Sequence, residues 1–335
     1  MPRVTHPTLI FALSESGELG GRIAATAGGE LAALEERRFE RGEFKLRPLV
    51  SVRDRDVVVI QTLAAGEGSP IADRLVRLLF LLCGLRDAGA DRRIACVPYL
   101  AYARKDRRTQ PRDPVNTRYV AELLEAAGLD KLIALDVHNP AALDNAFRVP
   151  VDHLSALPML SAHFAQRLAG RSLAVASPDV GGIKRAQLFR EQLTRHTGAD
   201  VTMAFIEKRR VGGAVSGEAL VGEVSGRVVI VIDDLCSTGG TLVRAALACR
   251  RAGAAEVFAA VTHAPMSDGL DVLVAESALT GVVTTDSVGE DFRARVASAA
   301  GRLEVLSIAP LFGEALRRMT AGEPLAPLLT HWPLR

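Results

Sequence analysis

The chain has 335 residues, with 41 Lys and Arg against 39 Asp and Glu, so its formal charge at pH 7 is only +2. Hydrophobic residues make up 48% of the sequence, which is enough for a sizeable core and excludes global disorder. A near-neutral chain with 4% aromatic residues is not typical of a nucleic-acid-binding protein. The length favours about two domains.

The sequence also argues against a membrane or secreted protein. Charged residues interrupt the most apolar long segment, residues 71–90, so no membrane span is expected. The first residues lack the basic start and apolar stretch of a signal peptide. The cysteines form no C-x-x-C motif and are expected to be reduced thiols: Cys83, Cys96, Cys236 and Cys249. We therefore expect a cytoplasmic protein with no membrane partner.

Short apolar runs alternate with longer amphipathic segments along the chain. Six runs are apolar without alternation, as in a parallel sheet covered on both faces: 57–61, 94–98, 132–136, 173–176, 228–232 and 257–261. Helices are predicted near 71–88, 116–127, 155–169, 182–196, 240–252 and 310–319. This alternation predicts right-handed βαβ units and an α/β fold.

Three of these helices end in the same way before the next strand. Gly89, Gly128 and Gly253 each follow a helix, where glycine adopts the left-handed conformation easily. The recurrence fits either the general form of such loops or two similar α/β domains, one in each half. Residues 147–151 are the expected crossover between the halves.

The segment after the strand at 228–232 has the strongest chemical pattern. The strand ends in two carboxylates, Asp233 and Asp234, which at this end of a parallel strand suit sugar hydroxyls or a metal. The turn that follows has glycines, which let the backbone approach a ligand, and hydroxyls that add donors for a phosphate. A phosphorylated sugar fits both the two carboxylates and the turn that follows them. The expected binding residues in the turn are Ser237, Thr238, Gly239, Gly240 and Thr241.

The alternative for this segment is an ordinary tight turn, which two adjacent acids at the end of an apolar strand disfavour. No Gly-Lys-Ser/Thr follows the strand and no G-x-G-x-x-G is present, so neither a Walker A loop nor a dinucleotide fingerprint is indicated.

Residues 233–241, DDLCSTGGT, resemble the PRPP-binding signature of phosphoribosyltransferases and ribose-phosphate pyrophosphokinases. Further segments resemble pyrophosphokinase motifs, in the same order along the chain: RFERGE at 38–43, PYLAYARKDRR at 98–108, LDVH at 135–138, SPDVGG at 177–182 and EKRR at 207–210. The sequence is thus similar to the ribose-phosphate pyrophosphokinase family over about two thirds of its length.

The resemblance implies two phosphoribosyltransferase-like (type I) domains, each a mostly parallel sheet flanked by helices. Residues 1–149 would form the nucleotide side and 150–308 the side that holds ribose 5-phosphate. Residues 309–335 would form a C-terminal helix and tail that pack back on the first domain. The implied reaction transfers the β,γ-diphosphoryl group of ATP to the 1-hydroxyl of ribose 5-phosphate. Mg²⁺ and a homo-oligomer are also implied.

Residue roles follow from the same resemblance. Lys208 and Arg210 would be catalytic, on a loop that closes over the substrate, although a solvated charge run is the alternative. His138 and Asp179 would hold Mg²⁺, with Asp136 on the same side of the strand as His138 and able to orient it. A structural His138 is the alternative. The expected ATP-binding residues are Phe39, Arg41, Gly42, Glu43, Arg104 and Lys105.

Departures from the family pattern fall mainly in the nucleotide region. Arg41 replaces the usual Asp and Lys105 the usual Gln, which leaves the donor nucleotide open. Ser237 replaces the common Asp, as in archaeal-type members, and the loop from Arg108 to Val115 is short. Phosphate activation, ADP inhibition and the number of subunits therefore do not follow from the family. Two alternatives stay open: a non-catalytic regulatory paralogue and a phosphoribosyltransferase that consumes PRPP.

Overall fold

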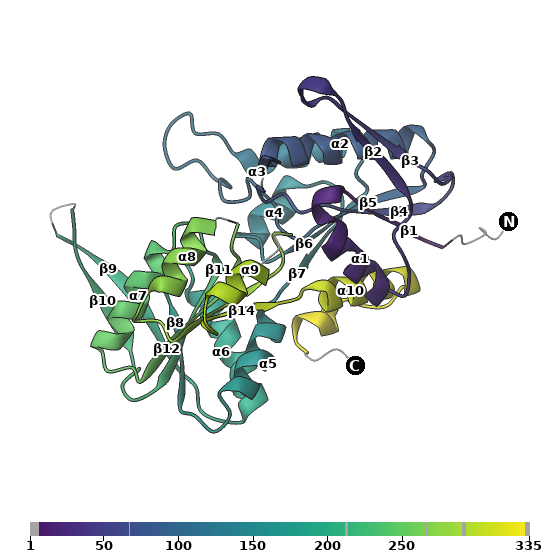
Figure 1. The fold of residues 1–335 in the computed structure, drawn as a ribbon. Helices are drawn as coiled ribbons and strands as arrows, with labels where there is room; N and C mark the ends of the chain where they lie inside the picture. Colours follow the sequence, from purple (N-terminus) through teal and green to yellow (C-terminus); the bar gives the residue numbers. More distant parts are fainter. Residues whose placement is uncertain (1–6, 67, 212–213, 266, 290–292, 332–335) are drawn as a thin grey trace. The chain divides into compact units, whose positions relative to one another are not determined.

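The computed structural model describes residues 7–66, 68–211, 214–265, 267–289 and 293–331, which form two compact units (Figure 1). The first unit comprises Met1–Leu154, Ser287–Glu290 and Ile308–Leu325. The second comprises Ser155–Asp286, Asp291–Ser307 and Ala326–Arg335. In the described part of the chain no helix is both long and apolar enough to cross a membrane.

The first unit is built on a five-stranded parallel sheet in the order β1-β4-β5-β6-β7. Its strands are β1 (Leu9–Ala12), β4 (Asp56–Ile60), β5 (Arg92–Val97), β6 (Lys131–Leu135) and β7 (Val151–Leu154). The last four residues of β4 are fully buried, since helices cover both faces of the sheet. The predicted crossover at 147–151 leads into β7, which pairs with β6 in this same sheet.

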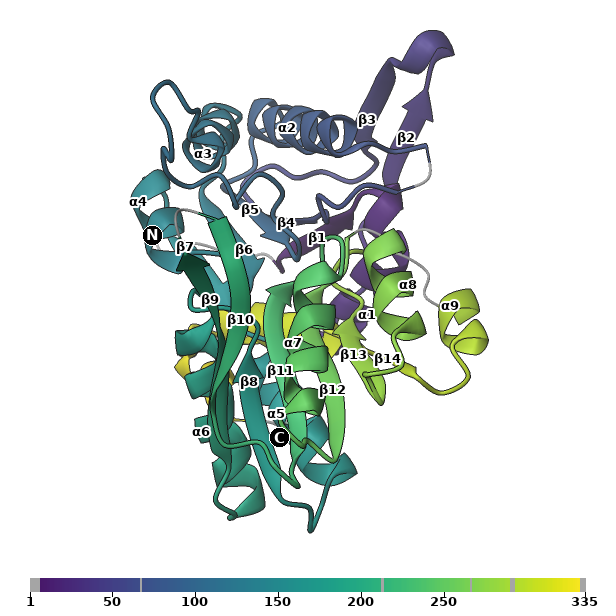
Figure 2. The same ribbon diagram turned by 90° about the vertical axis from the view of Figure 1, so that its left-hand side faces the viewer.

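Helices α2 (Ile71–Asp87) and α3 (Asn116–Ala126) lie together over one face of this sheet (Figure 2). The 3-10 turn η1 (Ser14–Ser16) leads from β1 into α1 (Gly17–Thr26). The short α4 (Pro140–Ala146) begins at Asn139, whose side chain accepts the Ala142 N–H. Late in the chain, α10 (Ala309–Ala321) packs against α1, with Gly313 at the contact because an added Cβ would come within 2.4 Å of Thr26.

A separate two-stranded hairpin projects from the first unit. It is formed by β2 (Leu34–Arg38) and β3 (Phe44–Pro48), joined by the turn η2 (Glu40–Gly42). The strands pair only with each other among the described strands. The hairpin was not among the predicted elements, because its strands are rich in charge and short of apolar residues.

The second unit contains a seven-stranded sheet in the order β10-β9-β8-β11-β12-β13-β14. Its pairs are parallel except for the edge hairpin β9–β10. The strands are β8 (Leu173–Ser177), β9 (Thr202–Val211), β10 (Ala214–Gly222), β11 (Val228–Leu235), β12 (Glu256–His263), β13 (Gly281–Thr285) and β14 (Leu303–Leu306). The helices are α5 (Leu157–Arg167), α6 (Ile183–Thr197), α7 (Gly240–Arg251), α8 (Ser267–Ala275) and α9 (Arg293–Ser298), with a 3-10 turn η3 (Ala326–Leu329).

Aromatic rings fill the core on the α5–α6 side of this sheet. Phe164 of α5 lies edge-on to Phe189 of α6 and to Phe258 of β12, with ring centroids 6.3 and 5.9 Å apart. Edge-to-face packing at these distances is favourable. These ring contacts hold α6 against α5 and the sheet.

The predicted α/β fold and its principal strands and helices are confirmed. The three glycine caps are confirmed too: Gly89, Gly128 and Gly253 have φ of 82°, 99° and 88°. At each cap, the residue after the glycine donates its N–H to the carbonyl five residues earlier, which ends the helix. One local prediction is wrong: residues 207–210 are not a loop but part of β9, since β10 supplies an antiparallel partner.

Candidate active site

The loop between β11 and α7 has the geometry of a phosphate-binding turn. Gly239 has a φ of 76° and caps α7, where the Val243 N–H donates to its carbonyl at 3.0 Å. Thr238 is exposed, while Ser237 and Thr241 are half-buried. A helix that begins in a loop with such hydroxyls offers N–H and O–H donors to an anion. Cys236 precedes them as an inert thiol, because burial raises its pKa to about 11.

Close packing against α8 holds this loop in place. A Cβ on Gly239 would come within 2.7 Å of the Gly269 carbonyl oxygen. A Cβ on Gly269 would lie 1.9 Å from the Ser237 carbonyl oxygen. The turn after β11 and the start of α8 therefore fit together only because both positions are glycine.

Asp233 and Asp234, predicted at the end of a strand, lie in the last residues of β11, and both pair with Arg185 of α6. Arg185 places Nη1 3.1 Å from Asp233 Oδ1 and Nη2 3.2 Å from Asp234 Oδ2. Burial, together with a hydrogen bond and the charge of Asp234, raises the pKa of Asp233 to about 8, while Arg185 opposes this shift. In such a pair, one carboxyl group tends to hold a proton. The pair can therefore accept hydrogen bonds from sugar hydroxyls and also donate one to them.

Sequence reasoning missed Arg185. It lies 48 residues before Asp233 and belongs to none of the segments that resemble family motifs. A signal was present, since Arg185 comes three residues after the SPDVGG segment and thus within the first turn of the helix that this segment opens.

Asp179 lies in that segment and fixes the start of α6. Its Oδ1 accepts the Gly182 N–H at 3.0 Å, and its carbonyl accepts the Ser177 hydroxyl at 2.6 Å. A Cβ on Gly182 would lie 2.6 Å from Ser177 Oγ, so the turn is too tight for a larger residue. The Asp179 loop and the carboxylate pair are therefore connected through α6 within the second unit.

His138 belongs to the first unit and is exposed in the loop after β6. The strand ends at Leu135, and Asp136 has a φ of 37°, so the alternation expected to place Asp136 and His138 on one side of a strand does not apply. The next residue, Asn139, donates to Asp106 Oδ2 at 2.6 Å. The structure thus joins the His138 loop to the predicted nucleotide segment at 104–108.

Lys105 is tied into its own loop. Its ammonium group pairs with the Asp113 carboxylate, with Nζ 2.5 Å from Oδ2. Asp113 also accepts N–H groups from Thr109 and Gln110, and the hydrogen bond from Lys105 is the largest cause that holds its pKa below the usual range. Lys105 therefore closes the loop, while Arg104 beside it is exposed.

The remaining predicted nucleotide residues lie at the tip of the β2–β3 hairpin. Phe39 is 41% exposed, with the Arg37 guanidinium 5.0 Å from its ring centroid. Arg41 and Gly42 both have positive φ, of 65° and 95°. For Arg41 this is a conformation that Asp and Asn adopt far more readily.

The hairpin does not meet the segment that contains Arg104 and Lys105. Figure 2 draws the hairpin on one side of α2 and α3, and the loop that leads into α3 on the other. Within one chain, therefore, the structure separates the predicted nucleotide residues into two groups.

Lys208 and Arg210 lie on β9, where their backbones pair with β10 opposite Glu218 and Val215. Their side chains lie outside the described residues.

The donor set for a metal is sparse. Among the residues that the structure describes, no three His, Cys, Asp or Glu side chains gather in one cluster. The two predicted ligands supply one exposed imidazole, from His138, and one carboxylate, from Asp179. Mg²⁺ normally keeps several waters and binds substrate phosphates through few protein groups, so a sparse set of protein donors is compatible with Mg²⁺.

Comparisons with known proteins show the family of the chain. The family model for the N-terminal domain of ribose phosphate pyrophosphokinase matches residues 8–128, and that for the phosphoribosyl synthetase-associated domain matches 208–330. The ribose-phosphate pyrophosphokinase of Fusobacterium nucleatum is 35% identical over 321 residues, covering 95% of this chain and 97% of that protein. That of Caldanaerobacter subterraneus subsp. tengcongensis is 35% identical over 331 residues, covering 98% and 100%.

A solved structure supports the same assignment. The crystal structure of phosphoribosylpyrophosphate synthetase from Mycobacterium smegmatis has a TM-score of 0.83 and 30% sequence identity, and the match covers 95% of this chain and 100% of that one. The similarity extends over both α/β units rather than over the phosphate-binding turn alone. The chain therefore belongs to the ribose-phosphate pyrophosphokinase family.

Proposed function

We propose that the protein is a ribose-phosphate pyrophosphokinase. The 1-hydroxyl oxygen of ribose 5-phosphate attacks the β-phosphorus of ATP, the bond between the α,β-bridging oxygen and the β-phosphorus breaks, and the hydroxyl proton is released. The products are PRPP and AMP. The observation that carries the proposal is the turn after β11, which joins a phosphate-binding helix start to two carboxyl groups on one strand end.

The sugar phosphate occupies this turn. The 5-phosphate accepts hydrogen bonds from the start of α7 and from the hydroxyls of Ser237, Thr238 and Thr241. Asp233 and Asp234 bind ribose hydroxyls, and Arg185 keeps the carboxyl pair from repelling the incoming phosphate. Ser237 supports this role, because a hydroxyl donates where a carboxylate would repel, and the archaeal-type assignment of the loop is part of the proposal.

The nucleotide and the metal use the other predicted residues. His138 and Asp179 hold Mg²⁺, which when bound neutralises phosphate charge. Arg104 binds the ATP phosphates; its segment is joined to the His138 loop by the hydrogen bond from Asn139 to Asp106. Lys208 and Arg210 stabilise the charge that develops on the transferring group, a task that rests on positioning and electrostatics.

The separation of the nucleotide residues favours a homo-oligomer. Phe39 and Glu43 are exposed on a projecting hairpin, on the other side of α2 and α3 from Arg104. We propose that one ATP is held by the hairpin of one subunit and by the loop of another. Since ATP and sugar phosphates are cytoplasmic metabolites, the proposal includes a cytoplasmic location.

Release of AMP tests the function. Purified protein is incubated with ribose 5-phosphate, Mg²⁺ and ATP, and with other nucleoside triphosphates in parallel because Arg41 and Lys105 depart from the family pattern. We expect AMP and PRPP in equal amounts. No nucleoside monophosphate with any donor would refute the proposal, and a base-dependent release of pyrophosphate from PRPP would indicate a phosphoribosyltransferase instead.

A further inference from the structure

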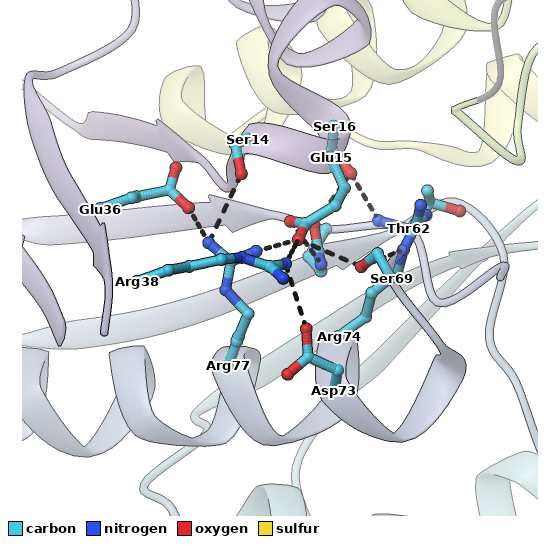
Figure 3. Close-up of polar contacts among 11 residues, drawn as sticks. Ser14, Glu15, Ser16, Glu36, Arg38, Thr62, Ser69, Asp73, Arg74 and Arg77 are labelled. Carbon is cyan, nitrogen blue, oxygen red and sulfur yellow. Dashed lines mark hydrogen bonds and ion pairs between the residues drawn. The ribbon is translucent and has the colours of Figure 1, made fainter. Parts of the chain in front are cut away.

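A network of charges centred on a buried arginine connects the hairpin to the body of the first unit. Arg77, in the middle of α2, is only 2% exposed. Its two terminal nitrogens pair with different carboxylates, Nη1 with Glu15 of η1 and Nη2 with Glu36 of β2 (Figure 3). One guanidinium group therefore joins three elements that are far apart in the sequence.

Arg38 adds a second connection from β2. Its Nη2 lies 3.4 Å from Glu15 Oε1 and 3.3 Å from Asp73 Oδ2 of α2. Glu15 also accepts the Ser69 hydroxyl at 3.2 Å. Glu15 is thus the shared acceptor to which both arginines connect (Figure 3).

The two charged residues that β2 contributes, Glu36 and Arg38, lie on its inner face. Leu34, at the base of the hairpin, packs against the apolar core, and Glu36 and Arg38 follow at alternate positions on the same face. Glu35, on the outer face, pairs instead with Lys45 and Arg47 of β3. Hairpin and body are therefore joined by apolar contact near the base and mainly by ion pairs toward the tip.

Apolar contact is limited near the tip. Phe44 of β3 lies 5.4 Å from Phe80 of α2, measured between ring centroids, and its ring is 5.8 Å from the Arg77 guanidinium carbon. Phe80 itself is 59% exposed. A two-stranded hairpin is only marginally stable by itself, so these few connections set its orientation.

We propose that Arg77 is a positioning residue for the nucleotide: by pairing with Glu15 and Glu36 it fixes the angle of the β2–β3 hairpin and hence the place of Phe39 and Glu43. Phe39 directly follows Arg38, so a change in the orientation of β2 also displaces Phe39 at the tip of the hairpin. Hydrogen-bonded ion pairs are directional, whereas apolar contact is not, which is why this role requires a guanidinium group. The inference rests on the proposed function, because that function gives the hairpin tip its ligand.

Three variants separate positioning from simple charge compensation. Arg77→Met keeps most of the side-chain volume but removes both ion pairs. Arg77→Lys restores a positive charge but cannot form two fork-like contacts at once. Glu36→Gln keeps an acceptor for Arg77 and is the milder change if Arg77→Met fails to fold. Arg92→Met is the matched control, since it breaks an exposed arginine–carboxylate pair, with Asp56, in the same unit.

Hydrogen exchange gives a readout that needs no activity. We expect the amides of residues 34–48 to exchange faster in Arg77→Met and Glu36→Gln, with no change in β11. In steady-state assays, a displaced tip should raise the KM for ATP about tenfold or more, while kcat and the KM for ribose 5-phosphate change little. Arg77→Lys should recover thermal stability but not the KM for ATP. Arg92→Met should behave as the wild type in all assays.

Two outcomes would overturn the inference. One is a folded Arg77→Met variant with wild-type exchange in the hairpin. The other is faster exchange with an unchanged affinity for nucleotide. Nucleotide binding is also measured by calorimetric titration with a non-hydrolysable ATP analogue, so the two proposals can be told apart. If the wild type forms no AMP but binds the analogue in an Arg77-dependent way, the proposed function fails and the positioning role is supported.

Discussion

A single methyl group at Gly269 should disable the proposed sugar-phosphate site. The position lies in α8, and a Cβ there would stand 1.9 Å from the Ser237 carbonyl oxygen and 3.2 Å from the Thr238 carbonyl carbon. The obstacle is backbone on both sides, so no flexible side chain can move to relieve it. Gly269→Ala therefore forces the phosphate-binding turn and α8 apart.

The size of the effect follows from this distance. A carbon and a carbonyl oxygen need about 3.3 Å, so the two segments must separate by about 1.4 Å. Misplacement of a site by about 1 Å costs about 100-fold in rate, which corresponds to about 2.7 kcal/mol. We expect kcat/KM for ribose 5-phosphate to fall at least that far, with much less change in the KM for ATP.

The assay is release of AMP with each substrate varied in turn, and circular dichroism shows whether the variant folds. Gly84→Ala is the matched control, because a Cβ at Gly84 in α2 meets nothing within 4 Å. That variant should keep full activity and gain up to about 1 kcal/mol in stability from helix propensity. A folded Gly269→Ala enzyme within about threefold of the wild type in kcat/KM would refute the packing argument.

Three further predictions concern charged groups of the site. Lys208→Ala should lower kcat about 100-fold or more with an unchanged melting temperature, whereas Arg209→Ala, which removes a charge that is not among the proposed catalytic residues, should stay near the wild type in the AMP assay. Because the pKa of Asp233 is raised to about 8, the folded protein keeps a proton on Asp233 that the unfolded chain loses above about pH 4. The free energy of unfolding therefore decreases as the pH rises from about 4 toward 8. Melting temperatures of the ligand-free protein should therefore fall between about pH 5 and pH 8, and Asp233→Asn should remove that contribution; a fall of the same size in the variant would contradict the assignment. Lys105→Gln should speed hydrogen exchange in the loop closed by Asp113 without altering the choice between ATP and GTP in competition assays, and a changed choice would show that Lys105 contacts the base.

The β9–β10 hairpin is a feature that local sequence did not predict correctly. Residues 207–210 are charged and precede two glycines, a pattern that indicates a loop when only local sequence is considered. The structure extends β9 to Val211, because β10 provides antiparallel partners from Ala204 to Val211. Strand formation depends on such a partner, which is why a charged segment can be a strand.

The sequence by itself determined the parts whose causes are local. Apolar runs bounded by helix signals identified the central strands, glycine after a helix identified three caps, and the small residues after Asp234 identified the turn that opens α7. In each case the residues that dictate the conformation are neighbours in the chain. Periodicity and turn chemistry therefore sufficed.

Only the tertiary structure decided which charges meet. Arg185 pairs with acids 48 and 49 residues away, Lys105 pairs with Asp113 rather than standing free, and Arg77 joins carboxylates from two other elements. An arginine in a helix has the same local pattern whether it faces water or a buried carboxylate. Its partner is set by how helices pack on the sheet, and that packing is decided by the whole core rather than by the residues near the charge.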